Sequence, residues 1–399
     1  MLANLFKQKP QPRNTKSISN FEFPNYAEYI SANKVANASS YKHNVIVYRC
    51  VNIITQSASH VTWLIYKNKG SSYEKLTNHP LYKLLDHPNH AVAGADFFTE
   101  VIGNLLLFGN SYVLGVGKDN EPPKELHILA PKQTEVLLRD SLPSAYRYRH
   151  ARGENTYPIN LLNSKSRVLH LKTYNPLDPI YGLSALCAAS MPIEMQDSAS
   201  RWNNGLLRNG ARPSGALIMK DNAGYLSDEQ FERLKEQLVE KYSGAANSGK
   251  PLLLEGGLDW REMSISPKDM DFIESKNSAA REIALAFGVP PQLLGINGDN
   301  TYSNMQEARI ALWEETLIPL LNKIASSLTH WFAQFYGDDI YLDFDRDSIS
   351  ALSEKRENVW AKIAASDFMT INEKRAFAGL EPITGGDRLD GLDKAMGEV

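Results

Sequence analysis

The sequence has few cysteines, no long apolar run and no strong excess of charge of either sign. Its 399 residues include two cysteines, Cys50 and Cys187, too few for a disulfide framework or a zinc-binding cluster. The longest uncharged run, residues 101–117, contains glycines and asparagines and falls short of the ~20 apolar residues of a membrane-spanning helix. We therefore expect a reducing compartment and no membrane partner.

The charge balance also limits the functional class. Lysine and arginine together number 43, aspartate and glutamate 46, and the net charge is -3. This balance excludes a strongly basic protein that wraps nucleic acid, although a locally basic surface remains compatible with it. Apolar residues make up 43% and charged residues 22%, as in soluble globular proteins, and the length suits two to three domains.

Catalytic motifs are missing as well. The sequence contains no nucleophile elbow, zinc-protease motif or dinucleotide-binding glycine motif. Residues 244–250 match most of a phosphate-binding loop, but Pro251 replaces the hydroxyl residue that ligates magnesium. Residues 343–354 have the carboxylate spacing of a calcium loop, but Ser348 replaces its turn glycine. We predict no catalytic residue, no metal site and no cofactor.

The pattern of apolar residues predicts an α+β fold with mostly antiparallel strands. In the first half, we expect helices at 45–59, 79–85 and 96–108, and strands at 63–66, 111–116, 125–128, 134–138, 146–149 and 168–171. In the second half, we expect helices at 182–209 and 267–287 around a strand–helix–strand unit at 215–220, 228–241 and 251–255. Pro192 should kink the first of these helices or mark a late start.

A polar loop and a long helix follow. The loop spans residues 295–302, and the helix continues to residue 336, with Ser303 and Gln306 as an expected capping box. Pro319 lies inside this helix and should kink it. A strand is predicted at 340–344 and two helices within 352–379, the second capped by Thr370.

Basic residues are concentrated in two places. Residues 1–40 read as a flexible basic arm, which could contact nucleic acid or a neighbouring subunit or could be a solvated tail. Between Asp197 and Asp221 there is no acidic residue but four basic ones: Arg201, Arg208, Arg212 and Lys220. This stripe could equally be the solvated face of a helix.

Several stretches, in this order, resemble the portal (head-to-tail connector) proteins of tailed phages, in the short form also found in prophages and gene transfer agents. They are Tyr48-Arg-Cys-Val-Asn-Ile-Ile, His79-Pro-Leu-Tyr-Lys-Leu-Leu-Asp-His-Pro-Asn, Leu107-Phe-Gly-Asn-Ser-Tyr-Val, Tyr181-Gly-Leu-Ser-Ala-Leu, Ser275-Lys-Asn-Ser-Ala-Ala-Arg-Glu-Ile-Ala, Phe287-Gly-Val-Pro-Pro-Gln-Leu-Leu-Gly, Thr301-Tyr-Ser-Asn, Thr316-Leu-Ile-Pro-Leu, Glu373-Lys-Arg and Gly379-Leu-Glu-Pro. Together they extend over nearly the whole chain.

The resemblance implies the domain organisation of a portal subunit. After the arm, residues 1–40, its parts would be a wing at 41–181, stem helices at 182–212 and 263–289, a clip at 213–262, a tunnel loop at 290–303, a long helix and wing strand at 304–349, and a crown and tail at 350–399. The family forms rings, usually of twelve copies, at one capsid vertex of the virion. DNA is packaged and ejected through the ring.

Within this organisation we predict the following site residues. Channel-facing basic residues on the stem helices would be Arg201, Arg208, Lys268 and Lys276. DNA-facing residues of the tunnel loop would be Asn297, Asp299, Asn300, Thr301 and Tyr302. Residues of the clip that dock the motor or adaptor would be Lys220, Asp221, Glu229, Glu232 and Glu236.

The partners implied are further copies of the chain, double-stranded DNA, the large terminase, the major capsid protein and a head–tail adaptor, with assembly in the cytoplasm of a bacterial host. Two readings from other classes remain open. One is a monomeric α+β enzyme with an unidentified site, and the other is a nucleic-acid-binding protein that uses the basic arm.

Overall fold

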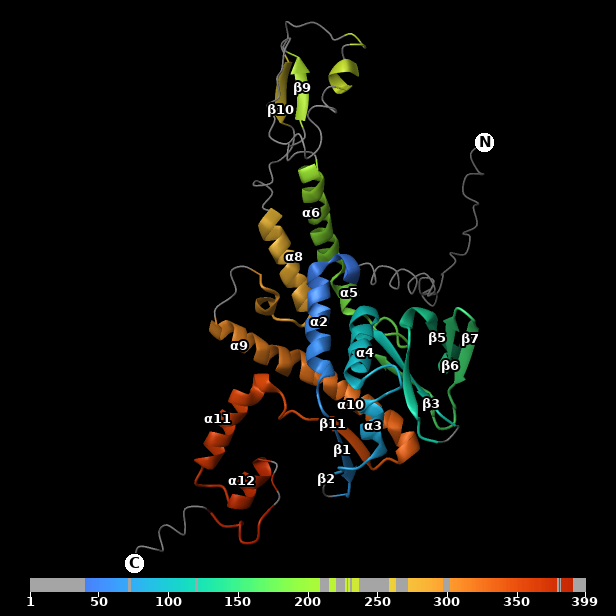
Figure 1. Ribbon diagram of the computed structural model, residues 1–399, viewed down its shortest axis with the longest axis vertical. Coiled ribbons are helices and arrows are strands. Elements are labelled where there is room, and N and C mark those ends of the chain that lie inside the picture. The colour runs from blue at the N-terminus through green and yellow to red at the C-terminus, as the bar shows by residue number, and fades with distance from the viewer. Residues whose placement is uncertain are drawn as a thin grey trace, which may run out of the picture.

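Figure 1 shows the computed structural model of the chain. The structure describes residues 40–70, 73–118, 121–208, 215–219, 227, 229, 232–236, 258–262, 272–296, 302–378, 380 and 382–389. It is a mixture of helices and antiparallel sheets, which confirms the predicted fold class. In all strand pairs of the described part, neighbouring strands run antiparallel.

Every helix and strand expected in the first half is present. They are α2 (Val45–Ser59), β1 (Trp63–Asn68), α3 (Pro80–Asp86), α4 (Gly94–Phe108), β3 (Asn110–Val116), β4 (Glu125–Leu129), β5 (Thr134–Arg139), β6 (Leu142–His150) and β8 (Val168–Lys172). Two further strands, β2 (Tyr73–Lys75) and β7 (Gly153–Pro158), were not predicted. Both are edge strands with nearly all side chains exposed, so they lack the alternation that marks a half-buried strand.

The expected helix at 182–209 is divided into α5 (Ala185–Ala188) and α6 (Ser190–Arg208). Pro192 lies in the first turn of α6, where a backbone N–H has no intrahelical partner, so the late start is the correct alternative. Strand β9 (Gly215–Met219) pairs with β10 (Leu258–Glu262), which was not predicted. The strand expected at 251–255 lies outside the described residues, and so do the first residues of the 267–287 helix, whose described part is α8 (Phe272–Phe287).

The long helix changes to a π-helical turn directly before its proline. It consists of α9 (Tyr302–Ala311), a π-helical segment (Leu312–Leu317) and α10 (Ile318–Tyr336). Ile318 N–H donates to the carbonyl of Trp313, five residues back, directly before Pro319. One wide π-helical turn thus accommodates Pro319, which has no backbone N–H to donate to a hydrogen bond. The capping box expected at Ser303 is wrong, since α9 begins at Tyr302 and Gln306 Nε2 donates instead to Glu354.

The main hydrophobic core joins helices from both halves of the chain. Ile54 of α2, Ile102 of α4, Ile283 of α8 and Leu321 of α10 are all completely buried in it. Each such side chain contributes roughly 1.5–3 kcal/mol relative to exposure. Strand β11 (Ile340–Phe344) pairs with β1 beneath α10. The C-terminal half of α8 is therefore fixed to the body, while Lys276 and Ser278 near its other end are exposed.

Two helices complete the chain, α11 (Ser353–Ala364) and α12 (Ile371–Phe377). The predicted cap of α12 is confirmed. The hydroxyl of Thr370 accepts from Glu373 N–H, and the Glu373 carboxylate accepts from Thr370 N–H, which forms a capping box. In Figure 1, α11 and α12 lie at the opposite end of the molecule from β9 and β10, with α6 and α8 side by side between the body and that strand pair.

Candidate functional site

Two of the family-like stretches, far apart in sequence, meet at a close backbone contact. Gly109 follows α4 with a φ of 68°, and a Cβ on it would lie 2.5 Å from the Gly182 carbonyl oxygen. A Cβ on Gly182 would lie 2.1 Å from the Gly109 carbonyl oxygen. A hydrogen bond to Asn110 stabilises the contact, because Asn110 Oδ1 accepts from Gly182 N–H at 2.9 Å. The glycines let the chain that leads into α5 and α6 cross the end of α4.

A second pair of stretches meets in the same way at the end of α8. Gly288 has a φ of 67°, and its carbonyl accepts from Thr316 Oγ1 at 2.6 Å. A Cβ on Gly288 would lie 2.6 Å from that hydroxyl oxygen. This contact fixes the C-terminal end of α8 to the π-helical segment. The two glycine junctions thus hold α6 and α8 in place relative to the core.

Helices α6 and α8 pack side by side and bring two predicted basic residues together. Arg201 of α6 and Lys276 of α8 are both exposed and line one open groove of about 630 Å³. His43, Ser200 and Asn204 also line it, and its one acidic residue is Asp197. Sequence reasoning missed His43, because it precedes α2 and no local pattern links it to α6.

Asn44 fixes the N-terminus of α2 to α6 at the floor of this groove. Its Oδ1 accepts from the backbone N–H groups of Ile46 and Val47, both at 3.1 Å, so it caps α2. Its Nδ2 donates to Gln196 Oε1 at 2.8 Å and to Asp197 Oδ1 at 3.1 Å. Asn44 is 3% exposed, and its bonds to Gln196 and to Val47 N–H are buried.

Replacing Asn44 by alanine should lower the free energy of unfolding by about 2–3 kcal/mol, because it removes a helix cap and leaves the buried Gln196 amide without its partner. Urea unfolding measures this loss. Asn52→Ala, in the same helix, is the matched control, since the Asn52 side chain makes an exposed bond to the Tyr48 carbonyl. A similar midpoint shift for both variants would contradict the role given to Asn44.

The remaining predicted site residues are only partly within the described structure. Arg208 is the last residue of α6, and Tyr302 is the first of α9, but nothing is described of either side chain. Of the residues predicted to form the clip, Glu229, Glu232 and Glu236 are exposed on a helical stretch, and Glu232 pairs with Lys235 at 3.4 Å. Outside the described residues lie Lys220, Asp221, Lys268, Asn297, Asp299, Asn300 and Thr301.

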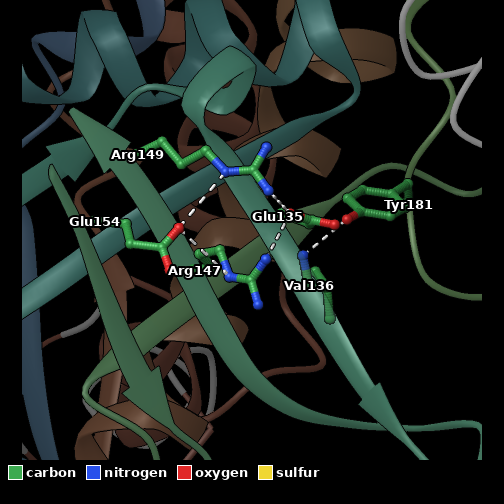
Figure 2. A network of polar contacts seen from close by, with 6 residues as sticks. All are labelled: Glu135, Val136, Arg147, Arg149, Glu154 and Tyr181. Atoms are coloured by element: carbon green, nitrogen blue, oxygen red, sulfur yellow. Dashed lines mark hydrogen bonds and ion pairs between the residues drawn. The ribbon is translucent and has the colours of Figure 1, made fainter. Parts of the chain in front are cut away.

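The sheet of β5, β6 and β7 carries a polar network that sequence reasoning did not find (Figure 2). Arg149 Nη2 pairs with Glu135 at 3.0 Å, and its Nε lies 3.8 Å from Glu154. Arg147 bridges the same two carboxylates at 3.8 and 3.9 Å. Arg147 and Arg149 occupy alternate positions of β6, but the register of β6 with β5 and β7 is needed to pair them with Glu135 and Glu154.

Beside this sheet, His170 lies in a cluster of tyrosines. Its ring stacks on Tyr112 at 4.4 Å and meets the edge of Tyr146 at 5.9 Å. Nε2 is 3.0 Å from Asn110 Oδ1, so it is the protonated nitrogen of a neutral ring. Burial, and secondarily the charge of Lys172, lowers the pKa of His170 to about 3. The Tyr181 hydroxyl accepts from Val136 N–H at 2.8 Å and joins the cluster to β5.

Acid should therefore destabilise the subunit through His170. Above pH 6.5 the ring is neutral in both the folded and unfolded chains, so stability is unaffected. Below pH 6.5 the imidazole of His170 binds a proton in the unfolded chain, whereas in the folded chain it stays neutral down to about pH 3. The free energy of unfolding therefore falls by less than about 1.4 kcal/mol per pH unit, since the His170 side chain is partly exposed to solvent. His170→Phe should flatten unfolding stability between pH 6.5 and 4, whereas a slope parallel to that of the wild type would overturn this assignment.

The described residues offer no assembly of catalytic groups. Among them, no cluster of three or more histidine, cysteine, aspartate or glutamate side chains is arranged to hold a metal ion. Burial raises the pKa of the Cys50 thiol to about 12, so it is not a nucleophile at neutral pH. In the calcium-like stretch, Asp343 and Asp347 pair with Arg346 and Arg356. None of the described helices has the length and apolarity to cross a membrane.

Comparison of the sequence with known protein families identifies the class of protein to which the chain belongs. The sequence model of the family described as "Phage portal protein" matches residues 45–379. The chain belongs to the phage portal protein family. The match includes both glycine junctions, the α6–α8 pair and α12. The family that the ordered stretches of the sequence resemble is thereby confirmed.

The chain is also similar to individual proteins and solved structures. A protein of Rickettsia bellii is 61% identical over 94% of this chain and 96% of its own length. The portal protein of Enterobacteria phage HK97 is 23% identical over 86% of this chain and 80% of its own. Among solved structures, a chain from the neck of a native gene transfer agent particle computed with C12 symmetry has a TM-score of 0.67 and 37% identity, covering 88% of this chain and 94% of that one.

This portal protein is a structural protein, not an enzyme, and these comparisons give no support to the monomeric enzyme considered as an alternative.

Proposed function

We propose that twelve copies of this portal protein form a ring at one capsid vertex of a phage or gene transfer agent particle, through which double-stranded DNA is packaged and ejected. The observation that carries the proposal is the family match over residues 45–379, together with the likeness to a chain from a twelvefold-symmetric neck. The protein acts in the assembled particle, or virion. The ring is assembled in the cytoplasm of the bacterial host.

The parts of the subunit take on separate roles in this proposal. Residues 41–181 with 304–349 form the wing against the major capsid protein, and residues 350–399 form the crown and tail. The segments 182–212 and 263–289 are the stem. The side-by-side packing of α6 and α8, anchored at one end by Asn44 and the glycine junctions, supports a stem role because it makes a rigid pair that projects from the core.

Double-stranded DNA passes along the stem and the tunnel loop at 290–303. Arg201 and Lys276, with Arg208 and Lys268, supply positive charge that is repeated in every copy of the ring. A few positive charges per subunit produce a strong field for DNA. In the tunnel loop, Asn297, Asp299, Asn300, Thr301 and Tyr302 include no basic residue, so they hold phosphate weakly and let DNA slide.

The clip, residues 213–262, docks the large terminase during packaging and a head–tail adaptor afterwards. Its exposed carboxylates Glu229, Glu232 and Glu236, together with Lys220 and Asp221, form the docking surface. Reversing these five charges should weaken terminase binding at least about tenfold while rings still form. Pull-down of the terminase by purified rings measures it, and undiminished binding would refute the docking surface.

Electron microscopy of the purified protein, with native mass spectrometry to count subunits, tests the proposed function as a whole. We expect rings with a central hole wide enough for duplex DNA. A chain that stays monomeric at every concentration, even with capsid protein present, would refute it. Removal of residues 1–40 should leave the rings intact, whereas a protein that binds DNA through its arm would lose DNA binding.

A further inference from the structure

The C-terminal helices have almost no core of their own. Between Ser353 and Leu389, the one buried residue among those that the structure describes is Gly386. Large apolar side chains are exposed throughout this unit, including Val359 at 45%, Trp360 at 43%, Phe377 at 68% and Phe368 at 81%. Exposed apolar groups gathered in one small unit normally mark a contact with another molecule.

Polar contacts attach the unit to the body. Lys355 Nζ pairs with Glu314 of the π-helical segment, and Gln306 of α9 donates to Glu354. Arg356 Nη1 donates to the carbonyl of Asp347 at 2.8 Å, and its guanidinium lies over the Trp360 ring at 5.4 Å. These contacts orient α11 but bury little apolar surface.

Where a core would be expected, between α11, α12 and the π-helical segment, there is an open pocket of about 430 Å³. Its apolar lining includes Val359, Trp360 and Phe377. Its charged rim has three basic residues, Arg346, Lys355 and Arg356, against two acidic ones, Glu314 and Asp347. Lys355 pairs with Glu314 and Arg356 with Asp347, so the excess positive charge of the rim is that of Arg346, whose partner Asp343 lies outside the lining. The pocket therefore suits an apolar side chain that has an acidic neighbour.

The chain itself presents such a side chain. Phe368 lies in the turn between α11 and α12, outside the lining of this pocket, and directly follows Asp367. An aromatic ring is smaller than the pocket, and the carboxylate of Asp367 complements the one excess positive charge of the rim. Phe368 and the pocket are different surfaces of the same unit, so one copy can fill the pocket of the next in a head-to-tail series that closes into a ring.

We propose that Phe368 of each subunit occupies the pocket of the neighbouring copy, so that α11 and α12 obtain their hydrophobic core only when a second copy of this chain is present. This inference rests on the proposed ring. It adds the surface that completes the C-terminal helices and the residues that meet there.

Cysteine cross-linking tests the contact while Phe368 is retained. In the double variant Asp367→Cys/Lys355→Cys, mild oxidation of purified rings should give a ladder of covalent dimers and larger species on a non-reducing gel. The double variant and both single variants are made with Cys187, which is partly exposed, replaced by serine, while Cys50 is buried. Each single variant should then give no ladder. Rings without a ladder, or a bond formed only within one chain, would overturn the inference alone. The absence of any rings would overturn the proposed function together with it.

A second measurement uses the aromatic side chain itself. Phe368→Ala should raise the rate of proteolysis within residues 353–389 of assembled rings about tenfold, because the unit loses its intersubunit core. Tyr174→Ala is the matched control, since Tyr174 is exposed to 82% and lies in the loop before α5. Equal proteolysis in the two variants would show that Phe368 does not protect the unit.

Discussion

Replacing Gly182 by alanine is expected to destabilise the subunit by about 3 kcal/mol or more. The new Cβ would lie 2.1 Å from the Gly109 carbonyl oxygen and 2.6 Å from the backbone nitrogen of Thr173. Both neighbours are backbone atoms, and Thr173 N–H itself donates to Gly109 at 2.9 Å, so neither can move cheaply. Overpacking of this kind costs about 1–3 kcal/mol even in a side-chain core, and a backbone crossing yields less readily.

Thermal unfolding of purified Gly182→Ala protein measures the effect, and we expect the transition to fall by at least about 5 °C. Gly205→Ala is the matched control. Gly205 lies inside α6, where an added Cβ meets nothing within 4 Å, so alanine should be neutral or stabilise by up to about 1 kcal/mol. Equal melting temperatures for the two variants would contradict the crossing as a structural requirement.

Neutralising the basic residues of the proposed stem should have the largest effect on function. In the variant Arg201→Gln/Arg208→Gln/Lys268→Gln/Lys276→Gln, we expect the yield of packaged DNA to fall about tenfold or more, because the charge is lost from every copy of the ring. Packaging should also become less sensitive to salt, since fewer phosphates are neutralised. DNA protected from nuclease, measured over a range of salt concentrations, reports both effects.

The control for this variant must remove positive charge elsewhere. Lys83→Gln/Arg152→Gln serves, because both residues are exposed, one in α3 and the other in the turn between β6 and β7. Packaging by this control should match the wild type. Unchanged packaging and unchanged salt dependence in the fourfold variant, with intact rings, would rule out a channel role for these residues.

Much of the secondary structure follows from patterns that span a few residues. The apolar stripe of α2 and the capping box of Thr370 and Glu373 could be identified because each depends on neighbours three or four positions away. The same patterns failed at β7, whose side chains are exposed on both faces. At Pro319 they indicated an irregularity in the helix but not its form, which is a π-helical segment that ends just before the proline.

The sequence by itself determined the fold class, most element positions and, through its ordered stretches, the portal family. Only the tertiary structure decided which side chains converge. It placed Asn44 against Gln196, 152 positions away, crossed Gly109 with Gly182, brought Lys276 to Arg201 and surrounded His170 with tyrosines. Helix and strand formation depends on local backbone preferences and periodicity, whereas these contacts depend on how apolar faces from distant segments pack into one core.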